Sequence, residues 1–167
     1  RKKYWLNDET CKWNENRNIK SNWKRISGEW GNEGNQVKVL RTTNFTNEGR
    51  LNLKEVVTRD IDLKKVEAKK LLPGDIIIEK SGGSPTQPVG RVVFFDQPDL
   101  YLCNNFTAIL RPKKDKVFPK YLLYMLFCNH RFGVTNNYQN KTTGIINLQL
   151  NRYLEEIQHS VTLTAFR

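Results

Sequence analysis

The chain has few of the residues on which metal binding and redox chemistry usually depend. Its 167 residues include only 2 histidines and 3 cysteines. Cys11, Cys103 and Cys128 are widely spaced and form no CxxC pair, so the sequence indicates neither a zinc site nor a disulfide framework. His130 and His159 have no cysteine or second histidine at ligand spacing, which argues against a histidine-based metal site.

Long hydrophobic segments are also missing. No apolar run approaches the roughly 20 residues that a membrane span requires. The first ten residues, RKKYWLNDET, lack the apolar centre of a secretion signal. We therefore expect a cytoplasmic chain that does not contact membranes. A hydrophobic content of 38% is typical of a globular protein, and the length predicts a single domain over residues 1–167.

Acidic residues are outnumbered. Lysine and arginine total 28 against 17 aspartates and glutamates, which gives a net charge of +11. Such an excess indicates a polyanionic partner, with nucleic acid ahead of a membrane surface. A merely solubilising surface is the alternative. The cations are interleaved with Asn, Thr, Gln and Ser, a pattern that favours a folded surface able to form hydrogen bonds as well as attract charge.

The apolar runs predict an α+β fold with a twisted, mainly antiparallel β-sheet flanked by helices. Strands are expected at residues 37–40, 51–57, 76–79, 90–95, 101–103, 107–111 and 161–163. Helices are expected at residues 63–70, 119–132 and 146–157, with Pro119 in the first turn of the second and Asn147 as N-cap of the third. Residues 1–26 form a polar lead-in, and long polar loops are expected at 41–49 and 134–144.

The connection between the apolar runs at 76–78 and 92–95 is unusually long. A hairpin needs only about two to five residues to turn. This one contains KSGGSPTQPVGR, with Lys80 and Arg91 at its ends. RTTNFTNEGR (41–50) and NNYQNKTTG (136–144) have a similar mixture of amide, hydroxyl, glycine and cationic residues.

Amide, hydroxyl and guanidinium groups can read base edges and bind phosphates, and glycine lets backbone N–H groups approach a phosphate closely. An ordinary surface loop is the simpler interpretation of each segment alone. Arg41 directly follows a predicted strand, so we expect it to read guanine, whereas Lys80 and Lys141 are expected on phosphates. Arg91 remains ambiguous, because it could instead pair with Glu79 or Asp96. The candidate DNA-binding residues are Arg41, Thr42, Thr43, Asn44, Lys80, Ser81, Gly82, Gly83, Ser84, Arg91, Asn136, Asn137, Tyr138, Gln139, Asn140, Lys141, Thr142 and Thr143.

A nuclease of the (D/E)-x-K type is a different possibility. Asp62 and Lys64 match its spacing, and Asp60 or Glu55 are the nearby acids that could complete a metal site. A charged, solvated helix start explains RDIDLKK more simply. No P-loop or dinucleotide fingerprint occurs. We expect no catalytic residue, bound metal or cofactor, and thus a chain that is not an enzyme on its own.

The stretch LLPGDIIIEKSGGSPTQPVGRVVFF (71–95) resembles the central motif of target recognition domains in the specificity subunits of type I restriction–modification enzymes. There, an apolar pair precedes a Pro-Gly-Asp turn, a strand, a Ser-Gly-Gly-Ser loop and a Val-Gly-Arg return strand. GEWGNEGNQVKVLRTTNFTNEGRL, PKYLLYMLF and NKTTGIINLQLNRYLEEI resemble further motifs of the family, in the same order. The resemblance covers residues 27–160.

The resemblance implies a domain that holds loops in the major groove of one half of a split DNA site. The domain would direct the methyltransferase and restriction subunits of a host-defence complex, and those subunits would carry the S-adenosylmethionine and ATP chemistry. Complete subunits have two such domains joined by long helices, so we expect an isolated recognition domain or a truncated subunit. A recognition domain from a fused methyltransferase–endonuclease and a general RNA- or phosphate-binding module remain alternatives.

Overall fold

The structure is a computed structural model that describes residues 36–61, 66–67, 69–84, 86–112, 117–142 and 144–164. Its strands are β1 Gln36–Leu40, β2 Val57–Asp60, β3 Ile76–Glu79, β4 Ser81–Gly83, β5 Val92–Phe94, β6 Tyr101–Cys103, β7 Thr107–Leu110, β8 Gln139–Thr142 and β9 Ile145–Leu148. The α-helices are α3 Pro119–Arg131 and α4 Leu150–Thr164, and two short 3-10 helices are η1 Thr42–Asn44 and η2 Val134–Tyr138.

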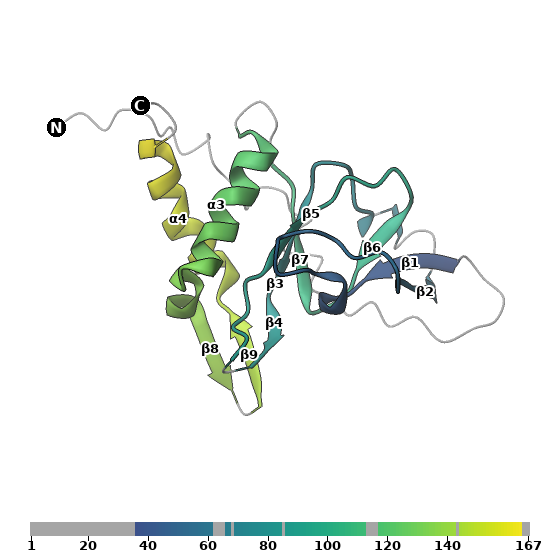
Figure 1. The fold of residues 1–167 in the computed structure, drawn as a ribbon, viewed down its shortest axis with the longest axis horizontal. Helices are drawn as coiled ribbons and strands as arrows, with labels where there is room; N and C mark the ends of the chain where they lie inside the picture. The colour runs from purple at the N-terminus through teal and green to yellow at the C-terminus, as the bar shows by residue number, and fades with distance from the viewer. Residues whose placement is uncertain are drawn as a thin grey trace.

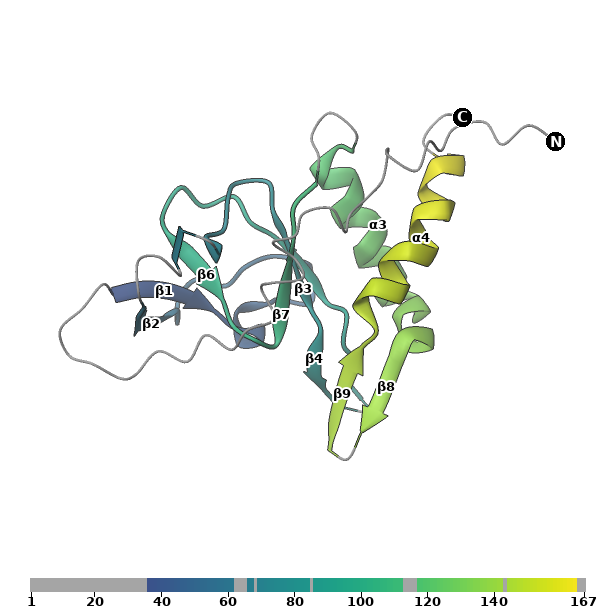
Figure 2. The same cartoon turned by 180° about the vertical axis from the view of Figure 1, so that it is seen from behind.

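The strands are distributed over three three-stranded sheets, with the orders β2-β1-β6, β5-β3-β7 and β4-β9-β8. Among the strands of the described residues, the β1–β6 pair is parallel and the other pairs are antiparallel. Figures 1 and 2 show α3 and α4 side by side at one end of the molecule and the β1 sheet at the other, with β3, β5 and β7 between them. The predicted α+β class with mainly antiparallel strands is confirmed.

Strand β3 lies at the centre of the core because both of its faces are covered. Successive side chains of a strand point to opposite faces. Ile76 and Ile78 face a cluster that contains α3, α4 and β9 residues, whereas Ile77 packs with residues from β1, β5, β6 and β7. All three isoleucines are fully buried. A run of consecutive β-branched residues therefore forms a strand here, since each face supplies apolar partners.

Helices α3 and α4 cover one face of this central sheet. Pro119 occupies the first turn of α3, where its missing N–H is not needed. Buried positions in α3 are Leu122, Leu123 and Leu126, and those in α4 are Leu150, Tyr153, Leu154 and Ile157. Their spacing of three and four residues gives each helix one apolar stripe, and both stripes pack into the same cluster.

Two ion pairs, each with a buried carboxylate, connect the ends of β3 to the neighbouring strands. Asp75, which precedes β3, is 1% exposed and accepts two hydrogen bonds from Arg111, from Nε at 2.8 Å and Nη2 at 2.7 Å. The bond to Asp75 raises the pKa of Arg111 above its ordinary value. Glu79, the last residue of β3, is paired with Arg91 in the same way. Both arginines continue the strand register, because Ile76 pairs with Leu110 and Ile78 pairs with Val92.

Several local predictions were wrong. The strand expected at 51–57 begins only at Val57, and Leu51 forms a single bridge with Phe45. Residues 146–157 begin as strand β9, so Asn147 lies within a strand and is not an N-cap. Residues 161–163, expected as a strand, lie in α4. The loop expected at 134–144 contains η2 and β8, and the connection 80–91 contains β4.

Half of the helix expected at 63–70 falls outside the described residues, and residues 66, 67 and 69 of it are helical. The whole of residues 1–26 also falls outside the described residues, as do Asp62 and Lys64 of the nuclease alternative. Within the part of the chain that the structure describes, no helix is both long and apolar enough to cross a bilayer.

The Asp75–Arg111 pair predicts a large stability effect. Arg111→Ala should lower the free energy of unfolding by about 3 kcal/mol, because it leaves a buried carboxylate without its counter-charge. Urea unfolding measures this loss.

The matched control is Lys38→Ala, which removes the exposed partner of Asp99 in a pair with side chains 43% and 59% exposed. This change should cost far less, since water and salt screen exposed pairs. Equal losses in the two variants would contradict the role assigned to Asp75 and Arg111.

Candidate functional site

The three polar segments singled out in the sequence, 41–50, 80–91 and 136–144, meet around the loop that leads into β5. Each is held by specific contacts, so none is a long unsupported loop. The contacts determine which side chains remain at the surface.

The buried side chain of Asn44 stabilises segment 41–50 through hydrogen bonds to the backbone. It is 3% exposed, and its Oδ1 accepts a hydrogen bond from the Arg41 backbone N–H at 2.9 Å. Its Nδ2 donates to the carbonyls of Asn52 and Glu55 at 3.1 and 3.3 Å. Asn44 therefore fixes the turn, and it leaves Thr43 exposed and Arg41 half-buried at the surface. The Arg41 Nε is buried and has no hydrogen-bond partner among the described residues.

Arg91 joins segments 80–91 and 41–50. Its guanidinium donates to both oxygens of Glu79, at 2.9 and 3.1 Å. It also donates to the backbone carbonyl of Thr42 at 3.2 Å and lies 5.9 Å from the centre of the Phe45 ring. Its side chain is 13% exposed. Of the two alternatives for Arg91, the structure contains the Glu79 pair, so this guanidinium is occupied within the protein.

Segment 80–91 is a strand followed by a tight turn. Ser84 and Gln87 exchange backbone hydrogen bonds of 2.8 and 3.1 Å across the turn. Glycine is required at position 83, because a Cβ there would lie 2.7 Å from the Gln87 carbonyl oxygen. The turn presents the exposed side chains of Ser84, Thr86 and Gln87.

Lys80 is half-buried at the base of this turn. Its backbone N–H donates to Phe106, and its carbonyl accepts from the Leu148 N–H at 2.8 Å. Burial lowers the pKa of Lys80 below its ordinary value. An anion bound beside the Lys80 ammonium would favour the protonated form and so raise this pKa again.

The third segment and Thr135, the residue before it, pack against Val89 and Gly90 of the second segment. Gly90 has a φ of +112°, and a Cβ on it would lie 2.9 Å from Thr135 Cγ2. The Gln139 side chain donates to the Val89 carbonyl at 3.5 Å and to Asn136 Oδ1 at 3.1 Å. Tyr138 is buried, and its hydroxyl donates to Glu156.

The predicted residues thus divide by exposure. Asn44 and Tyr138 are buried and serve the fold. Exposed candidates are Thr43, Gly82, Ser84, Asn136, Asn137 and Asn140, and half-buried ones are Arg41, Thr42, Lys80, Ser81, Gly83, Arg91 and Gln139. Lys141 and Thr142 are positions of β8 whose side chains are not described, and Thr143 lies outside the described residues.

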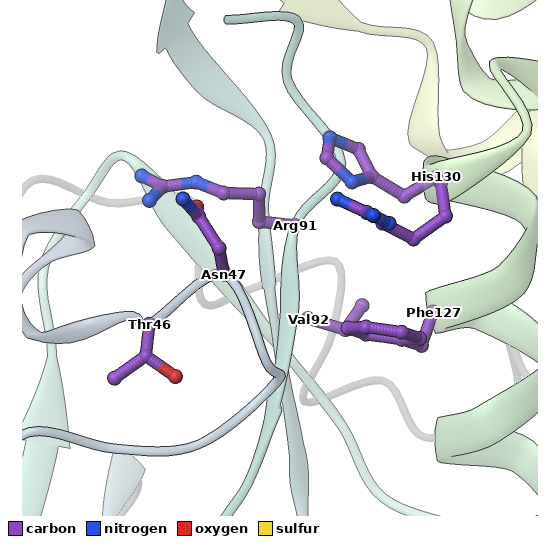
Figure 3. A pocket seen from close by; sticks show the side chains of 7 residues that line it. Thr46, Asn47, Arg91, Val92, Phe127 and His130 are labelled. Carbon is purple, nitrogen blue, oxygen red and sulfur yellow. The ribbon is translucent and has the colours of Figure 1, made fainter.

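A shallow pocket lies where segment 41–50 faces the end of α3. Thr46, Asn47, Arg91, Val92, Phe127, His130 and Arg131 line it. In Figure 3, Asn47 and Arg91 lie on one side and His130 and Phe127 on the other. A His130 ring nitrogen lies 3.2 Å from the Pro88 carbonyl oxygen, and Arg131 is exposed. Because the Arg91 guanidinium is paired with Glu79, the groups of the pocket suited to a phosphate are the exposed Arg131 guanidinium and the polar side chains of Thr46 and Asn47.

Sequence reasoning missed Thr46, Asn47 and Arg131 as site residues. Asn47 lies in a segment that was singled out, and Arg131 follows His130 in the last turn of a predicted helix. Nothing in the sequence indicates that these two places, more than 80 residues apart, lie together. Within the described residues, no three His, Cys, Asp or Glu side chains are grouped closely enough to hold a metal ion.

No family model matches the chain, and no curated protein does so either. The chain is similar to one in a solved structure concerned with complex assembly and conformational transition of the type I R-M system. The TM-score is 0.44 at 20% sequence identity, over 78% of this chain. This chain spans 33% of the length of that one.

The contact between Gly90 and Thr135 predicts a stability effect. Gly90→Ala should destabilise the fold by about 2 kcal/mol, because alanine disfavours a positive φ and its Cβ would overlap Thr135 Cγ2. Thermal or urea unfolding measures the loss.

Gly144→Ala is the matched control, since Gly144 has a φ of +82° but nothing within 4 Å of the added Cβ. It should cost only about 1 kcal/mol. Adding Thr135→Ser to Gly90→Ala removes the overlapping methyl and should restore part of the stability. No difference between the two glycine variants would contradict the close packing described here.

Proposed function

We propose that this chain binds double-stranded DNA sequence-specifically, as the specificity component of a type I restriction–modification complex. The observation that carries the proposal is the meeting of three polar, glycine-containing segments on a chain with a net charge of +11. The bond from Arg91 to Thr42 and the bond from Gln139 to Val89 bring segments that are distant in the sequence into contact. Such clustering gives one surface with both hydrogen-bonding and cationic groups, as DNA readout requires.

The side chains of this surface suit two different tasks. Exposed Asn136, Asn137 and Asn140 can pair with base edges, and Arg131 beside Thr46 and Asn47 can bind a phosphate. Arg91 and Asn44 are not assigned a DNA contact, because their polar groups are used within the protein. Their task is to position the residues around them.

In this proposal the chain catalyses nothing itself. It directs a methyltransferase subunit and a restriction subunit to one half of a split site, and those subunits use S-adenosylmethionine and ATP. The complex works in the cytoplasm. These assignments follow the sequence resemblance in LLPGDIIIEKSGGSPTQPVGRVVFF and its accompanying motifs.

Salt dependence tests the electrostatic part of the proposal. Affinity for duplex DNA should fall with salt by about 0.9 in log–log slope for each phosphate neutralised. Fluorescence anisotropy with a labelled duplex at several salt concentrations measures the slope. A flat response would contradict DNA binding by this chain.

Base readout and phosphate binding should separate by mutation. Arg41 follows β1, and its guanidinium can bond guanine at two points. Arg41→Ala should therefore relax the preference at one base pair in a selection from random duplex DNA. Arg131→Ala should weaken binding to all sequences alike and reduce the salt slope by about one.

The reverse outcome would contradict these roles. If Arg41→Ala lowers affinity uniformly while Arg131→Ala changes the selected sequence, Arg41 is the phosphate contact. Unfolding of both variants serves as a control, so that a loss of binding is not confused with a loss of fold.

A further inference from the structure

The hairpin formed by β8 and β9 projects from the body of the molecule. Both views show it extending away from the helices and from the central sheet (Figures 1 and 2). Its cross-strand partners are Gln139 with Leu148, Asn140 with Asn147, Lys141 with Ile146 and Thr142 with Ile145. The hairpin belongs to the β4-β9-β8 sheet, and β4 pairs with β9 at Asn147 and Ile146. The Thr142–Ile145 pair, which adjoins the turn, extends beyond the pairing with β4 and forms a two-stranded tip.

The two faces of this ribbon differ in character. Ile146 and Leu148 are 7% and 8% exposed and belong to the main core cluster. Because side chains alternate along a strand, Ile145 and Asn147 point to the opposite face. Asn140 lies directly across from Asn147 and shares that outward face. Ile145 is 46% exposed at the end of β9 that adjoins the turn.

The amides of this outward face are held in place. Ser81 of β4 is the strand partner of Asn147, and the Ser81 hydroxyl donates a hydrogen bond to the Asn147 side-chain oxygen. The Asn140 Oδ1 accepts a hydrogen bond from Gln149 Nε2 at 2.5 Å. Fixed amides lose less side-chain entropy on binding than mobile ones, so they bind a base edge that fits them more tightly. The face thus presents a row of positioned polar groups that ends in a single exposed isoleucine.

The DNA major groove admits a two-stranded β-ribbon such as the tip of this hairpin, and the thymine methyl group is the apolar feature of that groove. We propose that the outward face of the β8–β9 hairpin enters the major groove, where Ile145 contacts a thymine methyl and Asn140 pairs with a neighbouring base edge. This inference rests on the proposed function and deepens it. It assigns base readout to Ile145, which carries no hydrogen-bonding side chain and was not among the sequence candidates.

Replacing thymine with uracil tests the contact without altering the protein. The duplex preferred by the wild-type chain is first selected from random DNA, and each thymine is then replaced singly by uracil, which lacks only the methyl group. At one position, wild-type affinity should fall about fourfold, the change expected from burying one methyl group. Ile145→Ala should bind the thymine and uracil duplexes equally at that position.

Leu100→Ala is the matched control, since Leu100 is 42% exposed and precedes β6 in a different sheet. It should retain the wild-type preference for thymine over uracil. Ile145→Ser, whose side chain carries no methyl group that could contact a thymine methyl, provides a second variant in case Ile145→Ala unfolds.

The possible failures are distinguishable. If the wild-type chain selects no duplex sequence, the proposed function is wrong. If it selects a sequence in which every uracil replacement is neutral, or in which no thymine occurs, DNA recognition stands but the Ile145 contact is overturned. The contact is equally overturned if the Ile145 variants keep the wild-type preference for thymine.

Discussion

Strand β3 is the element on which the rest of the structure depends. Its three isoleucines are buried on both faces of the strand, and a buried carboxylate lies at each end, Asp75 at the start and Glu79 at the finish. Burying either carboxylate without a counter-charge would strongly lower the free energy of unfolding. Arg111 and Arg91 supply that charge from the two neighbouring strands. Each donates two hydrogen bonds to its carboxylate, and this geometry also fixes the orientation of the guanidinium. A register slip in either neighbour would separate an arginine from its acid.

The same requirement shapes the proposed DNA-binding surface. Arg91 reaches Glu79 from the start of β5, and its remaining donors bind the carbonyls of Thr42 and Phe45. A pair that stabilises β3 thereby fixes segment 41–50 beside segment 80–91. Gly90, the preceding residue, allows η2 to pack closely on the other side. The polar segments 41–50 and 80–91 are thus supported by these contacts with the core strands.

The long apolar elements could be predicted from the sequence because their signals are local. IIIE, TAIL and PKYLLYMLF carry apolar runs or a proline start, and each folds as expected. Strand β8 could not be predicted in this way, because Gln139, Asn140 and Lys141 have no strand pattern of their own and pair only through β9. Asn147 resembles a helix cap locally, yet its register with Ser81 and Asn140 places it in a sheet.

The candidate site also has a part that local sequence signals predict and a part that they do not. Its three segments are visible in the sequence, whereas the burial of Asn44, the occupation of Arg91 and the approach of Arg131 to Asn47 arise from contacts between distant residues.

Amide hydrogen exchange, with and without the selected duplex, tests the central claim most directly. If the three segments form one DNA-contacting surface, exchange should slow in residues 41–50, 80–91 and 136–147. The amides of β1, β2 and β6, in a different sheet, should exchange at unchanged rates. Slowed exchange confined to α4 or to the β1 sheet, with the three segments unaffected, would contradict the account.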